Sequence, residues 1–491
     1  MGKFEKFKSP AKGYFMLLFI FSTQAFEGRA YGEGGNPEQN SKWNGIKKTG
    51  EQYSLLSVVI KDAAHAKFLN SAERDHGIRL DLWGVKGLQT NRSVSHAEVL
   101  VPAKDAARLS TLLQERKIEH YVKNSDIHNV ISAEREKLDQ RSVFNLTEDP
   151  SSFTLTEYHS YDEISLYLHS VAHKHPSFIS NITIGISSEG RPIVGVKIGL
   201  KNCGKKKAFI NGCVHAREWI ACASLIYAIN EIVTSPKKYS FLLDNYDIYI
   251  VPVLNPDGYV YTWSNETDGG DARLWRKTRS GPRSGCYGVD ANRNFDFEFG
   301  KEEGDNHDPC TSNYPGPKAF SEPEAKAVAD FLETHKDTMF VYMDIHAYSQ
   351  KLIFPYGVNG KKLQNEGKVR DVAEKAVKAI HSHNYGHTYE AGSVTEIMYK
   401  ASGLAIDYAM GKLNISFAYA MELRPSFNSD ETDGAGFLLP QEQIIPASQE
   451  CWIGIQEVLR EALNHTSPVA IVCKTVILIS LLLHELSKFT L

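Results

Sequence analysis

The stretch Ala208-Phe-Ile-Asn-Gly-Cys-Val-His215-Ala-Arg-Glu218-Trp219 decides the fold class, because an apolar strand gives way to a helix inside it. Residues 208–214 have the pattern of a strand, and a helical pattern begins near Glu218. A histidine at a strand end and a glutamate at a helix start can both face one metal ion. Zinc hydrolases commonly use two histidines and one carboxylate as ligands. On its own, His215-x-x-Glu218 also fits a surface ion pair or a polar helix start.

The same change of pattern recurs along most of the chain. Apolar runs at residues 208–210, 248–253, 340–344 and 415–421 alternate with helical patterns, and no second break appears between residue 158 and about residue 464. Such alternation is typical of an α/β domain with a mixed, largely parallel sheet and helices on both faces. We therefore expect one large domain at residues 153–465.

A smaller unit precedes this domain, at residues 51–131. Strand patterns at residues 53–60, 78–83, 93–101 and 119–123 surround two helical patterns, the first capped by Asp62 and the second preceded by Pro102. The order β-α-β-β-α-β is that of the ferredoxin-like α+β fold. A charged segment at residues 132–152 connects the two units, and Arg135, Lys137 and Arg141 are predicted to be exposed cleavage points. A linker helix that is not cut accounts for the same residues.

Composition excludes several classes of protein. The chain has 491 residues, of which 42% are hydrophobic, and its net charge is −4, from 55 Lys and Arg against 59 Asp and Glu. This balance indicates a globular protein and gives no basic surface for nucleic acid. Seven cysteines are too few for a disulfide-rich scaffold.

Both ends of the chain carry segments of another kind. Lysines followed by a short apolar run indicate a signal peptide at residues 1–30, before a flexible lead-in at 31–50, so we expect a secreted protein. Six Asn-x-Ser/Thr sequons are compatible with secretion. The apolar tail at 466–491 leaves three interpretations open: a weak membrane segment, a degenerate anchor signal or an extra amphipathic helix.

Eight motifs in fixed order make residues 53–464 resemble the metallocarboxypeptidases of the carboxypeptidase A and B family, the pancreatic zymogen type. They are His215-Ala-Arg-Glu-Trp, Asn255-Pro-Asp-Gly, Leu274-Trp-Arg-Lys-Thr-Arg-Ser, Gly288-Val-Asp-Ala-Asn-Arg-Asn, Ile345-His-Ala-Tyr-Ser-Gln, Tyr399-Lys-Ala-Ser-Gly, Met421-Glu-Leu-Arg and Phe437-Leu-Leu-Pro. The resemblance implies a zymogen whose N-terminal unit covers the active site until the connecting segment is cut, by a trypsin-like protease.

The resemblance also implies the catalytic residues. One Zn²⁺ per catalytic domain would be bound by His215, Glu218 and His346, while Asp290 would orient the first histidine. Glu422 would act as the general base toward a zinc-bound water. Arg276 would stabilise the oxyanion of the tetrahedral intermediate.

The substrate implied by the resemblance is the C-terminus of a peptide or protein. Asn292 and Arg293 would hold its carboxylate, and Tyr399 would close over it. Ile406 would form an apolar pocket floor that favours aromatic or branched aliphatic residues. Further substrate contacts would come from Arg217, Tyr348, Val394 and Phe437, with Gly357 also lining the pocket.

Other implied features include a disulfide between Cys286 and Cys310. Departures from the family pattern are one extra residue between Ile406 and Glu422, Ala347 in place of the usual serine, and a longer loop at residues 425–436. Two alternatives stay open: a catalytically silent peptide-binding protein of the same fold, and an enzyme with basic, B-type specificity.

Overall fold

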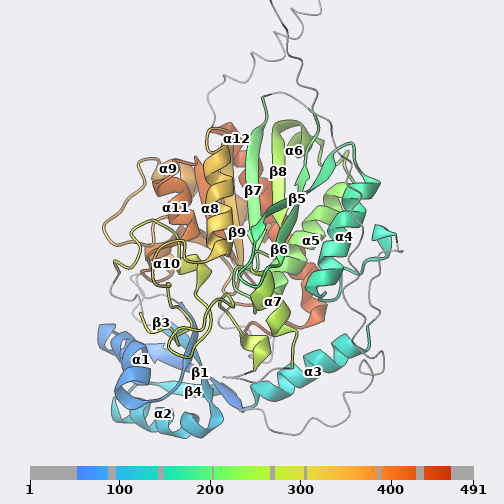
Figure 1. The fold of residues 1–491 in the computed structure, drawn as a ribbon. Coiled ribbons are helices and arrows are strands. Elements are labelled where there is room, and N and C mark those ends of the chain that lie inside the picture. The colour runs from blue at the N-terminus through green and yellow to red at the C-terminus, as the bar shows by residue number, and fades with distance from the viewer. Residues whose placement is uncertain are drawn as a thin grey trace, which may run out of the picture. The chain divides into compact units, whose positions relative to one another are not determined.

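The computed structural model describes eight stretches of the chain, namely residues 52–86, 95–141, 149–201, 204–265, 271–302, 307–383, 389–426 and 436–465 (Figure 1). All of them fall within one compact unit that begins at Gly50. The predicted signal peptide, the lead-in at 31–50 and the tail at 466–491 lie outside the described residues. Among the residues that are described, no helix is long and apolar enough to span a membrane.

The N-terminal domain has the predicted β-α-β-β-α-β order. Its elements are β1 (Tyr53–Ile60), α1 (Ala63–His76), β2 (Asp81–Lys86), β3 (Ser95–Pro102), α2 (Ala103–Glu115) and β4 (His120–Asn124). The sheet order β2-β3-β1-β4, with every pair antiparallel, is the ferredoxin-like arrangement. Asp62 caps α1 as predicted, because its Oδ1 accepts a hydrogen bond from the amide of His65 at 2.9 Å.

The first part of the predicted connecting segment belongs to a helix, α3 (Ile127–Asp139), which already begins within residues 51–131. The prediction of exposed basic residues is wrong for Arg135 and Arg141. Arg135 pairs with Asp271 at 3.0 Å, and the Arg141 side chain, 7% exposed, forms two hydrogen bonds to the Glu163 carboxylate. Lys137 is exposed as predicted. Buried carboxylates of the large domain attract both arginines. Residues 132–139 are helical, and Lys137 keeps the exposure that a cleavage point needs.

The large domain contains an eight-stranded sheet in the order β11-β10-β12-β9-β7-β8-β6-β5. Its strands are β5 (Ile179–Ile186), β6 (Pro192–Ile198), β7 (Lys206–Gly212), β8 (Tyr246–Val251), β9 (Met339–Ala347), β10 (Lys351–Phe354), β11 (Glu390–Ser393) and β12 (Phe417–Leu423). The central strands β12, β9, β7 and β8 are parallel, whereas β5, β6 and β10 introduce antiparallel pairs. The mixed, largely parallel sheet is therefore confirmed.

Helices cover both faces of this sheet, with α8 in front of the strands and α12 behind them in Figure 1. The helices are α4 (Tyr161–Lys174), α5 (Trp219–Thr234), α6 (Ser240–Asn245), α7 (Pro256–Thr262), α8 (Pro323–His335), α9 (Glu366–Ser382), α10 (Val394–Ile397), α11 (Ala405–Gly411) and α12 (Ile444–Asn464). Short 3₁₀ turns occupy Pro150–Ser152, Ala272–Leu274, Ala291–Arg293 and Gln441–Gln443. Helix α5 is apolar around most of its circumference and is correspondingly buried.

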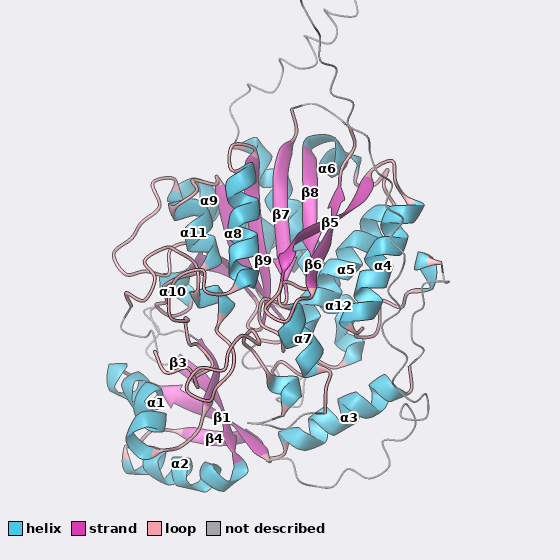
Figure 2. Ribbon diagram, in the orientation of Figure 1, coloured by secondary structure: helices cyan, strands magenta, loops and turns pink. Residues whose placement is uncertain are grey.

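The sheet brings the carboxyl ends of β7, β9 and β12 together, because these three strands are neighbours and parallel. Figure 2 shows β7 and β9 side by side in the sheet. Loops that leave the carboxyl ends of parallel strands form the usual ligand site of open α/β sheets. His215 follows β7, His346 lies near the end of β9 and Glu422 near the end of β12. The topology therefore assembles residues that are distant in sequence.

Candidate active site

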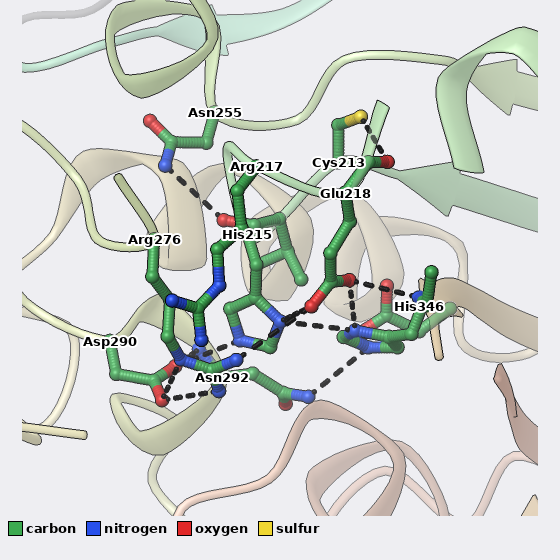
Figure 3. A network of polar contacts seen from close by, with 12 residues as sticks. Cys213, His215, Arg217, Glu218, Asn255, Arg276, Asp290, Asn292 and His346 are labelled. Atoms are coloured by element: carbon green, nitrogen blue, oxygen red, sulfur yellow. Dashed lines mark hydrogen bonds and ion pairs between the residues drawn. The ribbon is translucent and has the colours of Figure 1, made fainter. Parts of the chain in front are cut away.

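His215, Glu218 and His346 form a buried cluster (Figure 3). One ligand atom from each of the three lies within 4.8 Å of the other two. Glu218 precedes the first residue of α5, and its backbone carbonyl accepts a hydrogen bond from the Cys213 thiol at 3.2 Å. That bond ties the strand end to the helix start. The local sequence therefore fixes two of the three side chains, and β9 supplies the third.

Both histidines turn their Nδ1 atoms toward Glu218. His215 Nδ1 lies 2.8 Å from Glu218 Oε1, and His346 Nδ1 lies 3.1 Å from Glu218 Oε2. The other nitrogen of each ring faces a second carboxylate, Asp290 Oδ1 at 3.1 Å for His215 and Asp344 Oδ2 at 2.9 Å for His346. A carboxylate on the outer nitrogen fixes the tautomer and ring orientation of a metal-binding histidine.

Asp344 is a site residue that the sequence analysis missed. It precedes His346 by two positions in β9, so both side chains stand on the same face of the sheet. The Asp-x-His alternation in an apolar strand is the signal that would have found it. Asn292 also contacts this histidine, with its Nδ2 3.3 Å from His346 Nε2.

Electrostatics favour the charged form of the carboxylates in this cluster. Burial alone would raise the pKa of Glu218, but the neighbouring His215 and His346 lower it below its ordinary value. Burial also opposes ionisation of Asp290, and its pKa is nevertheless well below the usual range because of Arg276 and His215. Two imidazoles, each with a carboxylate near its outer nitrogen, and one ionised carboxylate are a suitable donor set for Zn²⁺.

Glu422 lies beside this cluster on β12, directly opposite His346 in the parallel register. Its Oε2 atom is buried and has no hydrogen-bond partner among the residues that the structure describes. Burial, with Glu218 adding to it and His346 opposing it, raises the pKa of Glu422 to about 7. A buried carboxyl group whose pKa is near neutral, and of which one oxygen accepts no hydrogen bond, is able to take up a proton.

Three basic or polar side chains predicted to bind the substrate carboxylate lie close together. Arg293 Nη2 donates a hydrogen bond to the Tyr399 hydroxyl at 2.8 Å, and Asn292 Oδ1 accepts one from the amide of Ala405 at 2.9 Å. Arg276 donates to Asp290 Oδ2 at 2.8 Å, and its Nη1 lies 3.7 Å from Glu218 Oε1. Both arginines also lie near the same carboxylate, since Arg293 Nη1 is 4.0 Å from Asp290 Oδ2.

The predicted specificity pocket is apolar. Ile406 is 4% exposed and Val394 is 6% exposed. A Cβ on Gly357 would stand only 2.6 Å from Leu404 and 3.4 Å from Val394, so a side chain at this position would collide with its neighbours. Next to Ile406, the carboxyl of Asp407 accepts a hydrogen bond from the amide of Gly357 at 2.9 Å, and burial raises its pKa to about 8.

Arg217, Tyr348 and Phe437 form a second group, which side chains of the N-terminal domain contact. Arg217 pairs with Asp81, and the Tyr348 hydroxyl donates a hydrogen bond to the buried carboxylate of Glu98. The rings of Trp83 and Phe437 lie 4.9 Å apart between centroids. We call Arg217, Tyr348 and Phe437 the covered surface.

The predicted disulfide between Cys286 and Cys310 is present. Among the cysteines that the structure describes, Cys213, Cys222 and Cys451 are free thiols and all are buried. Most of the loop at 425–436, in which a different pocket rim was expected, lies outside the described residues.

Comparison with known proteins confirms the resemblance. Residues 164–454 match the family model described as zinc carboxypeptidase, and residues 56–134 match the carboxypeptidase activation peptide. The chain is 32% identical over 417 residues to carboxypeptidase A1 of Bos taurus, covering 84% of this chain and 94% of that protein. It is 39% identical over 305 residues to carboxypeptidase B of Astacus astacus, covering 62% and 96%. The crystal structure of carboxypeptidase A from Helicoverpa armigera aligns with a TM-score of 0.74 at 27% identity, covering 85% and 99%.

Proposed function

We propose, from the premise that this chain belongs to the zinc carboxypeptidase family, that its large domain removes aromatic and branched aliphatic residues from the C-termini of peptides. The proposal includes an inactive precursor, in which the N-terminal domain blocks the site until the connecting segment is cut. The observation that carries it is the position of Arg293, Asn292 and Tyr399 beside the His215–Glu218–His346 cluster.

An enzyme that acts at a free C-terminus needs fixed cations at a set distance from the reacting bond. Arg293, held by its bond to Tyr399, presents a planar guanidinium that suits a carboxylate. Asn292 adds an amide donor that already contacts His346. This arrangement supports recognition of the terminal carboxylate rather than of an internal peptide.

His215, Glu218 and His346 would hold one Zn²⁺. When bound, that ion supplies Lewis acidity, which polarises a carbonyl group and acidifies water. Glu422 takes a proton from the attacking water. The proton goes to Oε2, which has no hydrogen-bond partner among the described residues, and is then returned to the amine of the departing residue. Arg276 lies on the Asp290 side of the cluster, where its guanidinium can stabilise negative charge on the carbonyl oxygen.

Specificity for apolar residues follows from Ile406 at the pocket. A basic side chain of the substrate would bury its charge against Ile406 and Val394. Position 406 carries no carboxylate to pair with that charge, so its burial is unfavourable. B-type specificity is the second candidate, because carboxypeptidase B of Astacus astacus is 39% identical to this chain.

Blocking of the precursor rests on the covered surface. Asp81, Glu98 and Trp83 each contact one of the residues expected to bind substrate beyond the terminal residue. A peptide would have to displace these contacts. The activating protease is expected to be trypsin-like, and Lys137 is the exposed basic residue of α3.

Secretion is part of the proposal and rests on the sequence of residues 1–30. Four of the six sequons have their asparagine in the described part of the chain, at Asn181, Asn265, Asn414 and Asn464, and all four asparagines are exposed. Exposed sequons are compatible with glycosylation in the secretory pathway.

The test uses the full precursor loaded with Zn²⁺, before and after trypsin treatment. Release of C-terminal Phe, Leu, Arg and Lys from matched peptides is compared with and without a chelator. We expect chelator-sensitive release of Phe and Leu after cleavage only. Release of Arg and Lys would support B-type specificity, whereas no release by a cut, zinc-loaded protein would indicate a silent peptide-binding protein.

A further inference from the structure

Lys351 is a buried lysine next to the proposed base. It is the first residue of β10 and is 1% exposed. In the antiparallel pair with β12 it stands directly opposite Glu422, which in turn stands opposite His346 on β9. Residues directly opposite each other in a sheet point to the same face. His346, Glu422 and Lys351 therefore form one row across three adjacent strands.

The ammonium group of Lys351 reaches the end of α10. Its Nζ donates a hydrogen bond to the backbone carbonyl of Ile397, the last residue of that helix, and lies 3.2 Å from the sulfur of Met398. Tyr399 follows immediately, and its hydroxyl accepts the hydrogen bond from Arg293. One buried cation thus joins β10, the neighbour of the strand of Glu422, to the segment that leads into Tyr399.

Core filling alone is a poor explanation for this lysine. Burying an ammonium group costs free energy unless acceptors replace its water, and an apolar side chain of the same length would fill the space without that cost. A short helix such as α10, with four residues, has little stability of its own. A charge-assisted bond to its last carbonyl would fix its end more firmly than a neutral contact.

We propose that Lys351 is a positioning residue, which fixes residues 397–399 against β10, next to the strand of Glu422, and so holds Tyr399 ready for the substrate carboxylate. This inference rests on the proposed function for the role of Tyr399. The hydrogen bond from Lys351 to the Ile397 carbonyl, which we call the tether, does not. Lys351 touches no reacting atom in this scheme, and its effect reaches the substrate through Tyr399.

The direct test is amide hydrogen exchange of the full zinc-loaded chain, comparing wild type with Lys351→Met. Methionine keeps the length of the side chain and removes the charge. The matched control is Lys205→Met. The Lys205 side chain is only 4% exposed and also donates to a backbone carbonyl, that of Leu200, besides pairing with Asp247, and Lys205 directly precedes β7. We expect exchange at residues 397–400 to become at least about tenfold faster in Lys351→Met and to stay unchanged in the control.

Kinetics of the cut enzyme give the second readout. Lys351→Met should raise KM for a peptide ending in Phe by about five- to tenfold and change kcat less, because the group acts on binding through Tyr399. In a Tyr399→Phe background the same change should add little to KM. Equal additional effects in both backgrounds would contradict action through Tyr399.

Unchanged exchange at residues 397–400 in Lys351→Met would contradict the proposal that Lys351 fixes this segment. An equally large change at residues 397–400 in Lys205→Met would contradict it as well. If the cut wild-type chain releases no C-terminal residue, the proposed function fails, yet the exchange experiment still decides whether Lys351 fixes this segment. The two failures are therefore distinguishable.

Discussion

The metal cluster and the covered surface lie side by side but are completed by different parts of the chain. His215 and His346 obtain their outer carboxylate partners, Asp290 and Asp344, from the large domain itself. Arg217 and Tyr348 obtain theirs, Asp81 and Glu98, from the N-terminal domain. Under the proposed function, the metal cluster is complete while the N-terminal domain is in place, so cutting the connecting segment would expose a binding surface rather than build a catalytic site.

The strongest test of the preformed cluster is Glu422→Gln. The amide cannot accept the proton of the attacking water, so kcat of the cut enzyme should fall by about 10²- to 10⁴-fold. Zinc content, measured by metal analysis, should not change, because Glu422 is outside the ligand set. Activity within about twofold of wild type would remove Glu422 from the mechanism.

Ile406→Asp tests the pocket that the cluster serves. A carboxylate at this position should pair with Lys or Arg side chains, so that the ratio of kcat/KM for Phe and Arg termini shifts toward Arg by on the order of 100-fold. Paired peptides that differ only in the last residue provide the measurement. An unchanged ratio would show that Ile406 does not form the pocket floor.

Asp344→Asn tests whether the outer carboxylates support metal binding. Loss of the charge beside His346 Nε2 should weaken zinc affinity by about 10- to 100-fold, as measured by competition with a chelator. Asp330→Asn on α8 is a suitable control, since this exposed carboxylate pairs only with Lys326 among the contacts described. Equal zinc affinity in the Asp344 variant and in wild type would contradict the role assigned to this carboxylate.

Asp81→Ala tests the covered surface. Removing the partner of Arg217 should loosen the N-terminal domain and raise the activity of the uncut precursor by roughly fivefold, with little effect on the cut enzyme. Glu119→Ala is the control in the same domain, because Glu119 pairs with Lys61 at the surface. Equal activity of both uncut variants would show that the contact between Asp81 and Arg217 does not contribute to inhibition.

The smallest effect concerns pH. Burial opposes the charge of Asp81, but Arg217 lowers the pKa of its carboxyl below 3.8. A carboxyl with a lowered folded-state pKa contributes its stability above the unfolded value and loses it as pH falls through the lowered one. Below about pH 3.8, retention of the cut N-terminal domain on the large domain should therefore decrease, as seen by gel filtration. Asp81→Asn should show a weaker pH dependence over this range, and an identical profile would exclude Asp81 as the titrating group.

Sequence patterns predicted much of the fold. Apolar runs and caps located β7, β8, β9 and β12, and the β-α-β-β-α-β order of the N-terminal domain followed from period and turn signals. The cleavable segment was less predictable. Arginines in a charged segment are expected to be exposed, as was predicted for Arg135 and Arg141. Their partners, Asp271 and Glu163, lie in the large domain, and the local sequence does not indicate these ion pairs.

The local sequence pattern made His215 and Glu218 a candidate ligand pair, because a spacing of three residues at a strand-to-helix change can keep both side chains in one place, and the family resemblance then selected the metal interpretation. Motif order, through resemblance, indicated His346 and Glu422. Tertiary structure alone decided the partners: Asp344 behind His346, Lys351 opposite Glu422, and Asp81 on Arg217. The physical reason is that strand pairing and domain contacts bring together residues that are far apart in the chain. Hydrophobic periodicity predicts where a strand lies but not which strands become its neighbours.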